Sequence, residues 1–271
     1  MSVDLYHLAD LKEFLQKNGL QAKRSLGQNF LFHKKECEKI IQAAGIRKGD
    51  KVLEIGPGLG HLTMLMEEAG AEVTACEIDR RLTDLWPELH PNFKGKLLQA
   101  DFLETSPEEY GRCTKVVANL PYYIVKEIIL KLLTCGVEWE SLTFTLQKEE
   151  VARLTKKQGE ERYGALNALL LILGGPDCAG VIKKDNFYPR PNIDSAILRI
   201  APILWPEYTL WQKTLKVVKA AFARRRKLLK SNLAELNVPG EAFSKLRISE
   251  LARAEELDPK LFLDLARFLP E

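Results

Sequence analysis

The chain has 271 residues, of which 46% are hydrophobic and 28% charged, and its formal net charge is +3. These values are typical of a globular domain with or without a small appendage, and they exclude intrinsic disorder and fibrous repeats. No apolar run reaches the roughly 18 residues that cross a bilayer, and no secretory signal opens the sequence, so we expect a cytoplasmic protein without a membrane anchor.

The cysteines and histidines show no pattern of covalent or metal chemistry. The five cysteines are odd in number and never form a Cys-x-x-Cys pair, and the four histidines lack the spacing of metal ligands. A reducing compartment fits this usage. We therefore expect neither a disulfide framework nor a metal site.

Hydrophobic periodicity changes twice along the chain. Residues 1–50 have a helical pattern with a loop near 25–29. Short apolar runs then alternate with amphipathic stretches, which predicts strands at 52–55, 72–76, 96–99, 115–118, 142–146 and 195–200, and helices at 59–69, 80–86 and 124–134. This alternation predicts an α/β fold with a doubly wound, parallel, Rossmann-like sheet and helices on both faces.

The last quarter of the chain has a different pattern. Pro202 and Pro206 bracket a break, and the periodic segments beyond it are all helical: 207–232, 239–246 and 258–268. We therefore expect a first domain over residues 1–203, which includes the helical segment 1–50, and a small all-helical domain over residues 204–271.

Residues 211–230 contain eight Lys or Arg and no acidic residue. On a helix, the apolar side chains of this segment share one face and most of the basic ones share the other. Exposed helices usually carry both signs in neighbouring pairs, so the lack of acid favours a polyanion partner over an ordinary solvated face. The candidate contacts are Arg224, Arg225, Arg226 and Lys227.

A glycine-rich turn, Gly56-Pro57-Gly58-Leu59-Gly60, lies where the first predicted strand meets a helix. Open α/β sheets bind ligands at this place, and glycine lets a ligand approach the backbone closely. His61 stands where a dinucleotide fingerprint has its last glycine, and no Lys-Ser/Thr pair supports a phosphate-binding P-loop.

Two acidic residues follow the next two strands. Glu77 ends the second strand, where a carboxylate accepts hydrogen bonds from ribose hydroxyls, and Asp101 follows the third, where it suits the amine of adenine. Together they indicate an adenosine ligand without a strong pyrophosphate anchor. S-adenosylmethionine fits this description better than NAD does.

The segment Asn119-Leu120-Pro121-Tyr122 follows the apolar run of the fourth strand. It combines an amide side chain, a carbonyl before proline and an aromatic ring. Together these groups can hold a flat, amino-bearing ring beside a reactive group. Because the residue before proline avoids the helical region, the backbone here is expected to be extended.

In combination these motifs resemble class I methyltransferases that act on adenine amines, and most specifically the small-subunit ribosomal RNA adenine dimethyltransferases of the KsgA type. The resemblance covers residues 25–260. The matching blocks are 25–31, 54–60, 77, 99–101, 119–122, 146–149, 163–166, 187–191, 194–196, 224–227 and 253–257.

The resemblance implies S-adenosylmethionine as the cofactor. It implies that Asn29 and Leu31 close over the cofactor, that Gly56 lies beneath its methionine part, that Glu77 holds the ribose and that Asp101 holds the adenine amine. The full set of implied cofactor contacts is Gln28, Asn29, Leu31, Gly56, Gly58, Glu77, Ile78, Asp101, Phe102 and Asn119.

The resemblance also implies the reaction, which is dimethylation at N6 of two neighbouring adenines near the 3′ end of small-subunit rRNA. The Asn119 side-chain oxygen and the Leu120 carbonyl are expected to accept the amine hydrogens, while Tyr122 and Phe187 stack on the target base. The substrate is expected to be rRNA within a pre-30S particle, and the protein to be a monomer with no obligate protein partner.

Two other functions remain as alternatives. One is a large-subunit rRNA adenine methyltransferase of the macrolide-resistance type, which shares single motifs with this chain. The other is a non-catalytic RNA-binding assembly factor with the same fold. The intact segment 119–122 and Glu77 favour an enzyme over the assembly factor.

Overall fold

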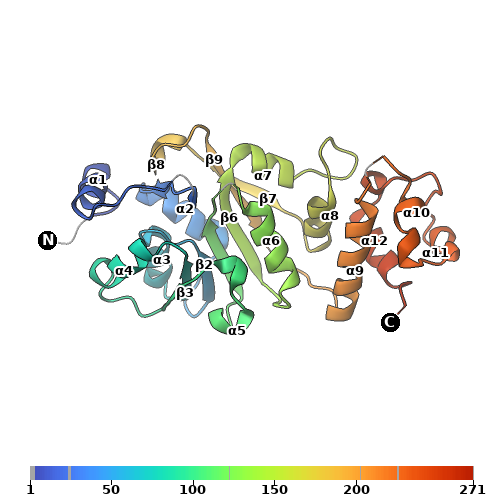
Figure 1. The fold of residues 1–271 in the computed structure, drawn as a ribbon, viewed down its shortest axis with the longest axis horizontal. Helices are drawn as coiled ribbons and strands as arrows, with labels where there is room; N and C mark the ends of the chain where they lie inside the picture. Colours follow the sequence, from blue (N-terminus) through green and yellow to red (C-terminus); the bar gives the residue numbers. More distant parts are fainter. Residues whose placement is uncertain (1–3, 24–25, 122, 202, 225, 271) are drawn as a thin grey trace. The chain divides into compact units, whose positions relative to one another are not determined.

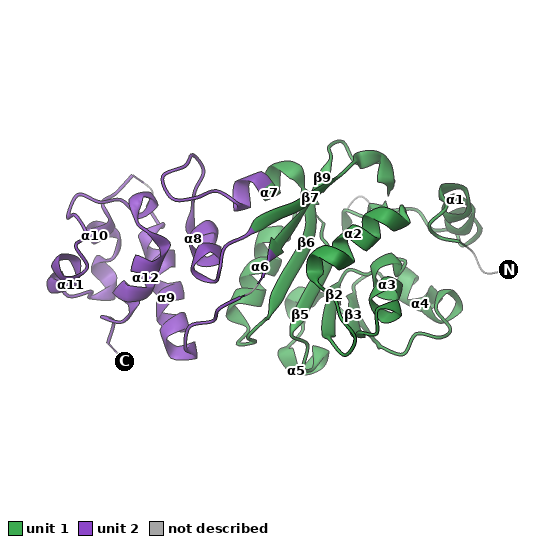
Figure 2. Cartoon of the chain, turned by 180° about the vertical axis from the view of Figure 1, so that it is seen from behind, with its two compact units in different colours: residues 1–151, 177–199 green, residues 152–176, 200–271 purple. Residues whose placement is uncertain are grey.

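The computed structural model describes residues 4–23, 26–121, 123–201, 203–224 and 226–270. The chain divides into two compact units, drawn in different colours in Figure 2. Unit 1 comprises residues 1–151 and 177–199, and unit 2 comprises residues 152–176 and 200–271. Among the described residues, no helix is both long and apolar enough to span a bilayer.

The helices and strands of unit 1 follow one another along the chain as Figure 1 labels them. Their bounds are α1 Leu8–Lys17, β1 Phe30–Leu31, α2 Lys34–Ala44, β2 Lys51–Ile55, α3 His61–Glu68, β3 Glu72–Glu77, α4 Arg80–Leu89, β4 Lys96–Gln99, α5 Pro107–Tyr110, β5 Lys115–Asn119, α6 Val125–Thr134, β6 Ser141–Gln147, β7 Asp177–Ile182, β8 Phe187–Tyr188 and β9 Ser195–Ile200, and α7 Lys148–Leu154 crosses from unit 1 to unit 2.

The main sheet has seven strands in the order β4-β3-β2-β5-β6-β9-β7. The strands from β4 to β6 are parallel, and the order reverses between β2 and β5. At such a switch point the two flanking helices diverge and leave a crevice at the carboxyl ends of the strands. The predicted α/β fold is confirmed, and all six predicted strands are present.

One edge of the sheet differs from the all-parallel prediction. Strand β7, which the sequence pattern did not reveal, pairs antiparallel with β9. The segment between β7 and β9 contains no α-helix in its described residues. A parallel pair of strands needs a long crossover connection, which is usually a helix. The short segment between β7 and β9 therefore allows only an antiparallel pair.

Both faces of the main sheet are covered. Val117 of β5 packs in a core cluster with side chains of α2 and α3, such as Ile40 and Met66, while its neighbours Val116 and Ala118 point to the opposite face. Helix α6 lies over that opposite face (Figure 1), and α2 comes to the front when the molecule is turned (Figure 2). Burial on both faces explains the continuous apolar run of β5.

The N-terminal fifty residues are not purely helical. Between α1 and α2 lies the two-residue strand β1, which pairs antiparallel with β8. In this pair Phe30 lies opposite Tyr188, and Leu31 lies opposite Phe187. The pairing holds the segment before α2 in an extended form, which local periodicity does not predict.

Every described element that lies wholly within unit 2 is helical. The α-helices are α8 Ala165–Ile172, α9 Tyr208–Ala221, α10 Leu229–Asn232, α11 Gly240–Lys245 and α12 Pro259–Ala266.

The two units differ from the predicted domains in two respects: the late boundary lies between residues 199 and 200 instead of between 203 and 204, and one internal segment belongs to the other unit. Residues 152–176, expected with the sheet, group with the C-terminal helices. The ring of Tyr163 packs edge-on against Phe222, and the Leu204 N–H donates to the Leu173 carbonyl at 3.0 Å. These contacts explain the grouping. The hydrophobic periodicity of residues 152–176 does not predict them.

Candidate active site

A pocket lies at the carboxyl ends of β2, β3, β4 and β5, where the strand order reverses. Because these strands are parallel, the turns that follow them meet at one edge of the sheet. Residues 26–31, which come before α2, form a further wall. The lining residues are Leu26, Gly27, Gln28, Asn29, Phe30, Leu31, Glu54, Ile55, Gly56, Pro57, Gly58, His61, Leu62, Cys76, Glu77, Ile78, Ala100, Asp101, Phe102, Leu103, Asn119, Leu120, Pro121, Tyr123, Ile124 and Ile128.

The turn after β2 presents bare backbone to the pocket. Gly56 has φ = +70°, a conformation that strains any residue with a Cβ, and a Cβ built there meets no atom within 4 Å. The Gly56 N–H donates to the Cys76 carbonyl of the neighbouring strand at 2.9 Å, which fixes the turn against β3. A ligand can therefore lie directly on this backbone.

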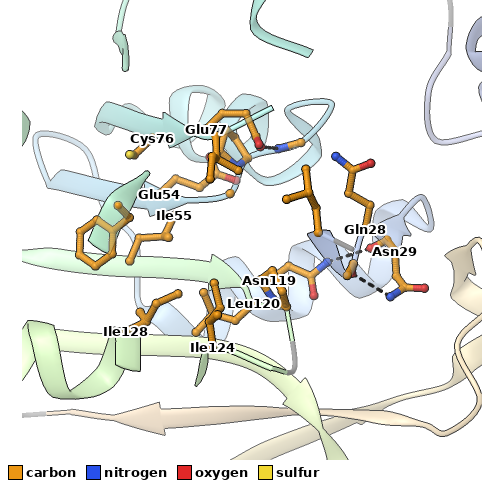
Figure 3. Close-up of a pocket in the computed structure, with 18 of the residues that line it drawn as sticks. Gln28, Asn29, Glu54, Ile55, Cys76, Glu77, Asn119, Leu120, Ile124 and Ile128 are labelled. Atoms are coloured by element: carbon orange, nitrogen blue, oxygen red, sulfur yellow. Dashed lines mark hydrogen bonds between the residues drawn. The ribbon is translucent and has the colours of Figure 1, made fainter. Parts of the chain in front are cut away.

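Glu77 presents a buried carboxylate at the end of β3. Its side chain is 5% exposed, and its two oxygens accept backbone N–H groups of Gly58 at 3.0 Å and Asp79 at 2.8 Å (Figure 3 draws the first of these). Burial raises the pKa of Glu77, and the backbone N–H donors partly oppose that shift. Each oxygen keeps a second lone pair, so the group can accept two hydroxyls as well.

A short turn after β4 forms the next part of the wall. Asp101 accepts the Leu103 N–H at 2.9 Å and thereby begins the 3₁₀ turn Phe102–Glu104. The ammonium of Lys131, from α6, lies 5.0 Å from the centre of the Phe102 ring and donates to the Thr105 carbonyl at 2.5 Å. These contacts hold the turn in place against α6.

Asn119 ends β5 with its amide at the pocket wall (Figure 3). Its Nδ2 donates to the Asn29 carbonyl at 3.1 Å, which defines the orientation of the amide. The Leu120 N–H donates to the Thr145 carbonyl of β6 at 3.2 Å, and Pro121 has no N–H. The backbone is thus held by the sheet on one side and faces the pocket on the other.

The structure brings together every predicted cofactor-binding residue. All ten line this one pocket, although they come from four strand ends and from the segment before α2. Asn119 and Leu120, predicted to hold the target amine, line it too. Tyr122, the third predicted catalytic residue, lies outside the described residues.

Phe187 does not join this group. Its side chain is 3% exposed and belongs to the core cluster that contains Cys37 and Ile40. The cause is the pairing of β8 with β1, where Phe187 lies opposite Leu31 and both side chains are buried. In this structure the side chain packs in the core, and its role as a ring that covers the target base stays a prediction.

Several pocket residues were not predicted as functional from the sequence, among them Glu54, His61 and Tyr123. Glu54 is 1% exposed, accepts a hydrogen bond from the Thr63 hydroxyl at 2.5 Å and has its pKa raised to about 8, mainly by burial. Burial lowers the pKa of His61 to about 4, and its Nε2 lies 3.0 Å from the Leu5 carbonyl.

Two of these residues carry a signal in the sequence. Glu54 stands inside an otherwise apolar strand, and glutamate is almost never fully buried without a reason. Tyr123 is 58% exposed at the pocket wall, beside the motif that the sequence did single out.

The basic segment is arranged differently from the prediction. A single helix over 207–232 is wrong, because α9 ends at Ala221 and α10 begins at Leu229. The Nδ2 of Asn232 donates to the carbonyls of Ala221 at 2.6 Å and Arg224 at 3.1 Å, so the chain turns where a helix would continue.

The candidate RNA contacts therefore lie on a loop of unit 2. Arg224, Arg226 and Lys227 are exposed there, and Arg225 is outside the described residues. An exposed loop with this charge can still approach phosphates, without the regular spacing of a helix face.

The pocket fits S-adenosylmethionine. Open backbone at Gly56 suits the methionine part, the lone pairs of Glu77 suit two hydroxyls, and Asp101 suits an exocyclic amine. With this sheet, the pocket defines a class I methyltransferase that uses S-adenosylmethionine. The model of the ribosomal RNA adenine dimethylases matches residues 19–271. The chain belongs to that family and is an rRNA adenine dimethyltransferase.

Relatives are similar over their whole length. "Ribosomal RNA small subunit methyltransferase A" of Novosphingobium aromaticivorans is 35% identical over 268 residues, which cover 97% of this chain and 98% of the relative. The protein of the same name from Listeria welshimeri is 34% identical over an alignment of 291 residues, which covers 100% of this chain and 98% of the relative.

Two solved structures share the fold. A dimethyladenosine transferase from Plasmodium falciparum superposes with a TM-score of 0.71 and 23% identity, covering 85% of this chain and 94% of that one. The 23S rRNA methyltransferase ErmE superposes with a TM-score of 0.65 and 24% identity, covering 90% and 100%.

Proposed function

We propose that this enzyme dimethylates the N6 amines of two adjacent adenines near the 3′ end of small-subunit rRNA, acting in the cytoplasm as a monomer on a pre-30S particle. One observation carries the proposal: four strand-end motifs, Gly56–Gly58, Glu77, Asp101 and 119–121, line one pocket. The target subunit is supported by full-length relatives named small subunit methyltransferase A.

We assign the cofactor contacts by the chemistry of each wall. The backbone at Gly56 supports the methionine part, Glu77 accepts both ribose hydroxyls, and Asp101 accepts the adenine amine. Ile78, which is 46% exposed at the pocket wall, covers one face of the adenine ring. When bound, S-adenosylmethionine supplies an electrophilic methyl group on a sulfonium.

The target amine needs activation because its lone pair is delocalised into the adenine ring. Asn119 Oδ1 and the Leu120 carbonyl each accept one amine hydrogen, which favours a pyramidal nitrogen and directs its lone pair toward the methyl group. The hydrogen bond from Asn119 Nδ2 to Asn29 supports this assignment, because it leaves Oδ1 as the acceptor end of the amide. Positioning and electrostatics suffice without a covalent intermediate.

The target base must reach this pocket from outside a stacked helix. Enzymes that act on a base either extrude it or take it from a single strand. We propose that the exposed loop with Arg224, Arg226 and Lys227 contacts the phosphates of the RNA, which supplies affinity without sequence specificity.

The test is to incubate the full-length protein with labelled S-adenosylmethionine and one of two substrates. The first is small subunits from cells that lack this methylation, and the second is bare large-subunit rRNA; modified bases are then mapped. We expect label on two adjacent adenines of the small subunit alone. Label confined to large-subunit rRNA would overturn the target assignment, and binding without transfer to either substrate would favour a non-catalytic assembly factor.

A further inference from the structure

Residues 26–31, here called the strap, cross the pocket and are attached on its β5 side. The Asn29 carbonyl accepts the Asn119 amide at 3.1 Å. Two residues earlier, Gly27 packs so closely on Pro121 that an added Cβ would lie 2.9 Å from the Pro121 Cβ. Gly27 has φ = +61°, so both its backbone angle and this contact call for glycine.

The strap is also attached on the β3 side. The Gln28 Nε2 donates to Asp79 Oδ2 at 2.8 Å, and Gln28 Oε1 accepts the Lys23 N–H at 2.8 Å. Both polar ends of this side chain are therefore used within the protein. Gln28 lines the pocket, but its amide bonds bridge the strap to the turn after β3.

Asp79 is a strong anchor for this bridge because it is buried and ionised. Its carboxylate is 3% exposed and accepts Nε and NH2 of Arg81 at 3.0 and 2.6 Å, and the Lys23 ammonium lies 3.5 Å away. Arg81 and then Gln28 lower the pKa of Asp79, to about 2. A hydrogen bond to a charged acceptor is stronger than one between neutral groups.

The anchor is also continuous with the proposed ribose site. The Asp79 N–H donates to Glu77 Oε1 at 2.8 Å, so the turn that holds Gln28 also orients the carboxylate that faces the pocket. The strap thus extends from the end of β3 to the end of β5, and its residues share the pocket with Gly56 and Glu77.

We propose that Gln28 is a positioning residue whose bond to Asp79 latches the strap across the pocket and slows the release of bound cofactor. This inference rests on the proposed function of the pocket. It assigns Gln28 no contact with the reacting atoms: the residue acts through the strap, which carries the carbonyl that orients Asn119.

The experiment measures dissociation of labelled S-adenosylhomocysteine from the full-length protein after a chase with excess unlabelled ligand. Gln28→Met keeps the size of the side chain and removes both hydrogen bonds. We expect release to be about tenfold faster, equivalent to about 1.4 kcal/mol, with little change in the association rate. The matched control is Gln21→Met, an equal substitution at an exposed side chain near the strap.

A charge-reversal pair separates the latch from a general loss of structure. Gln28→Glu places a second carboxylate against Asp79 and is expected to release the ligand faster than Gln28→Met does. Adding Asp79→Asn restores a donor and acceptor pair and keeps a residue that caps α4, so the double variant is expected to slow release again.

Three results would overturn the latch. They are a Gln28→Met release rate within twofold of wild type, an equal acceleration by Gln21→Met, and no recovery in the double variant. If the wild-type protein itself binds no S-adenosylhomocysteine, the assignment of the pocket is overturned, which is a different result from an unlatched pocket.

Discussion

The Asn119 amide and the Asn29 carbonyl, ninety residues apart in sequence, are joined by a hydrogen bond of 3.1 Å. The bond connects the end of β5 with the strap that crosses the pocket. An amide side chain can adopt two orientations that exchange its oxygen and its nitrogen, and this bond selects one of them for Asn119. The proposed cofactor cover and the proposed acceptor of the target amine are therefore a single hydrogen-bonded unit.

Replacing Asn119 by Ala should abolish most methyl transfer while S-adenosylhomocysteine still binds. Loss of one preorganised polar group at a reacting centre costs about 10²–10³-fold in rate. The rate is measured with labelled methyl donor, and affinity by calorimetry. Asn92→Ala, at an exposed asparagine outside this pocket, is the control and should leave both unchanged. A native rate in the Asn119 variant would contradict the proposed mechanism.

Gly27→Ala should weaken cofactor binding about tenfold. A left-handed backbone costs a non-glycine residue about 1–2 kcal/mol, and here the new methyl group would also press on Pro121 and displace the strap. Gly19→Ala is a close control, because Gly19 has φ = +62° and open space around it. Both variants should unfold at lower temperature, but only Gly27→Ala should raise the dissociation constant of S-adenosylhomocysteine. Equal binding by the two would show that the Pro121 contact is unimportant.

The sequence predicts the strand ends of this site well because each motif follows its own apolar run. Glu77 and Asn119 are the last residues of β3 and β5, Asp101 follows β4, and parallel strands carry such residues to one edge. Local pattern was therefore sufficient to place the three side chains in one pocket.

What the sequence could not predict depends on partners distant along the chain. Phe187 is buried because β8 pairs with β1, and at the end of α9 the Ala221 carbonyl accepts the Asn232 amide. The Gln28–Asp79 bond likewise joins two turns that no periodicity connects. Each of these features arises from a single tertiary contact, which overrides the local pattern.

Removing positive charge from the loop after α9 should weaken RNA binding and reduce its dependence on salt. Each lost phosphate contact lowers the slope of log K against log salt by about 0.7–0.9. Arg224→Ala with Arg226→Ala should therefore reduce the slope by about 1–2, as measured by titration of small-subunit rRNA at several salt concentrations. The control is Lys260→Ala with Arg267→Ala, which removes equal charge at two exposed residues of the same unit, one in α12 and one directly after it. If the two double variants reduce the slope equally, the loop has no special role.

The stability of the ligand-free protein should fall as pH rises from about 6.5 to 8, and Glu54 contributes to this fall. Burial raises the pKa of Glu54 from 4.5 to about 8, so over this range the folded state holds a proton that the unfolded state has released. Stability then decreases with pH by at most about 1.4 kcal/mol per pH unit for this group. His61, whose pKa is lowered from 6.5 to about 4, has the opposite slope, but only below pH 6.5.

The measurement is urea unfolding at half-unit steps of pH. Glu54→Gln cannot release a proton and should reduce the fall, leaving the contribution of Glu77, whose pKa is also raised by burial. An unchanged slope in Glu54→Gln would mean that Glu54 is ionised in the folded protein at neutral pH.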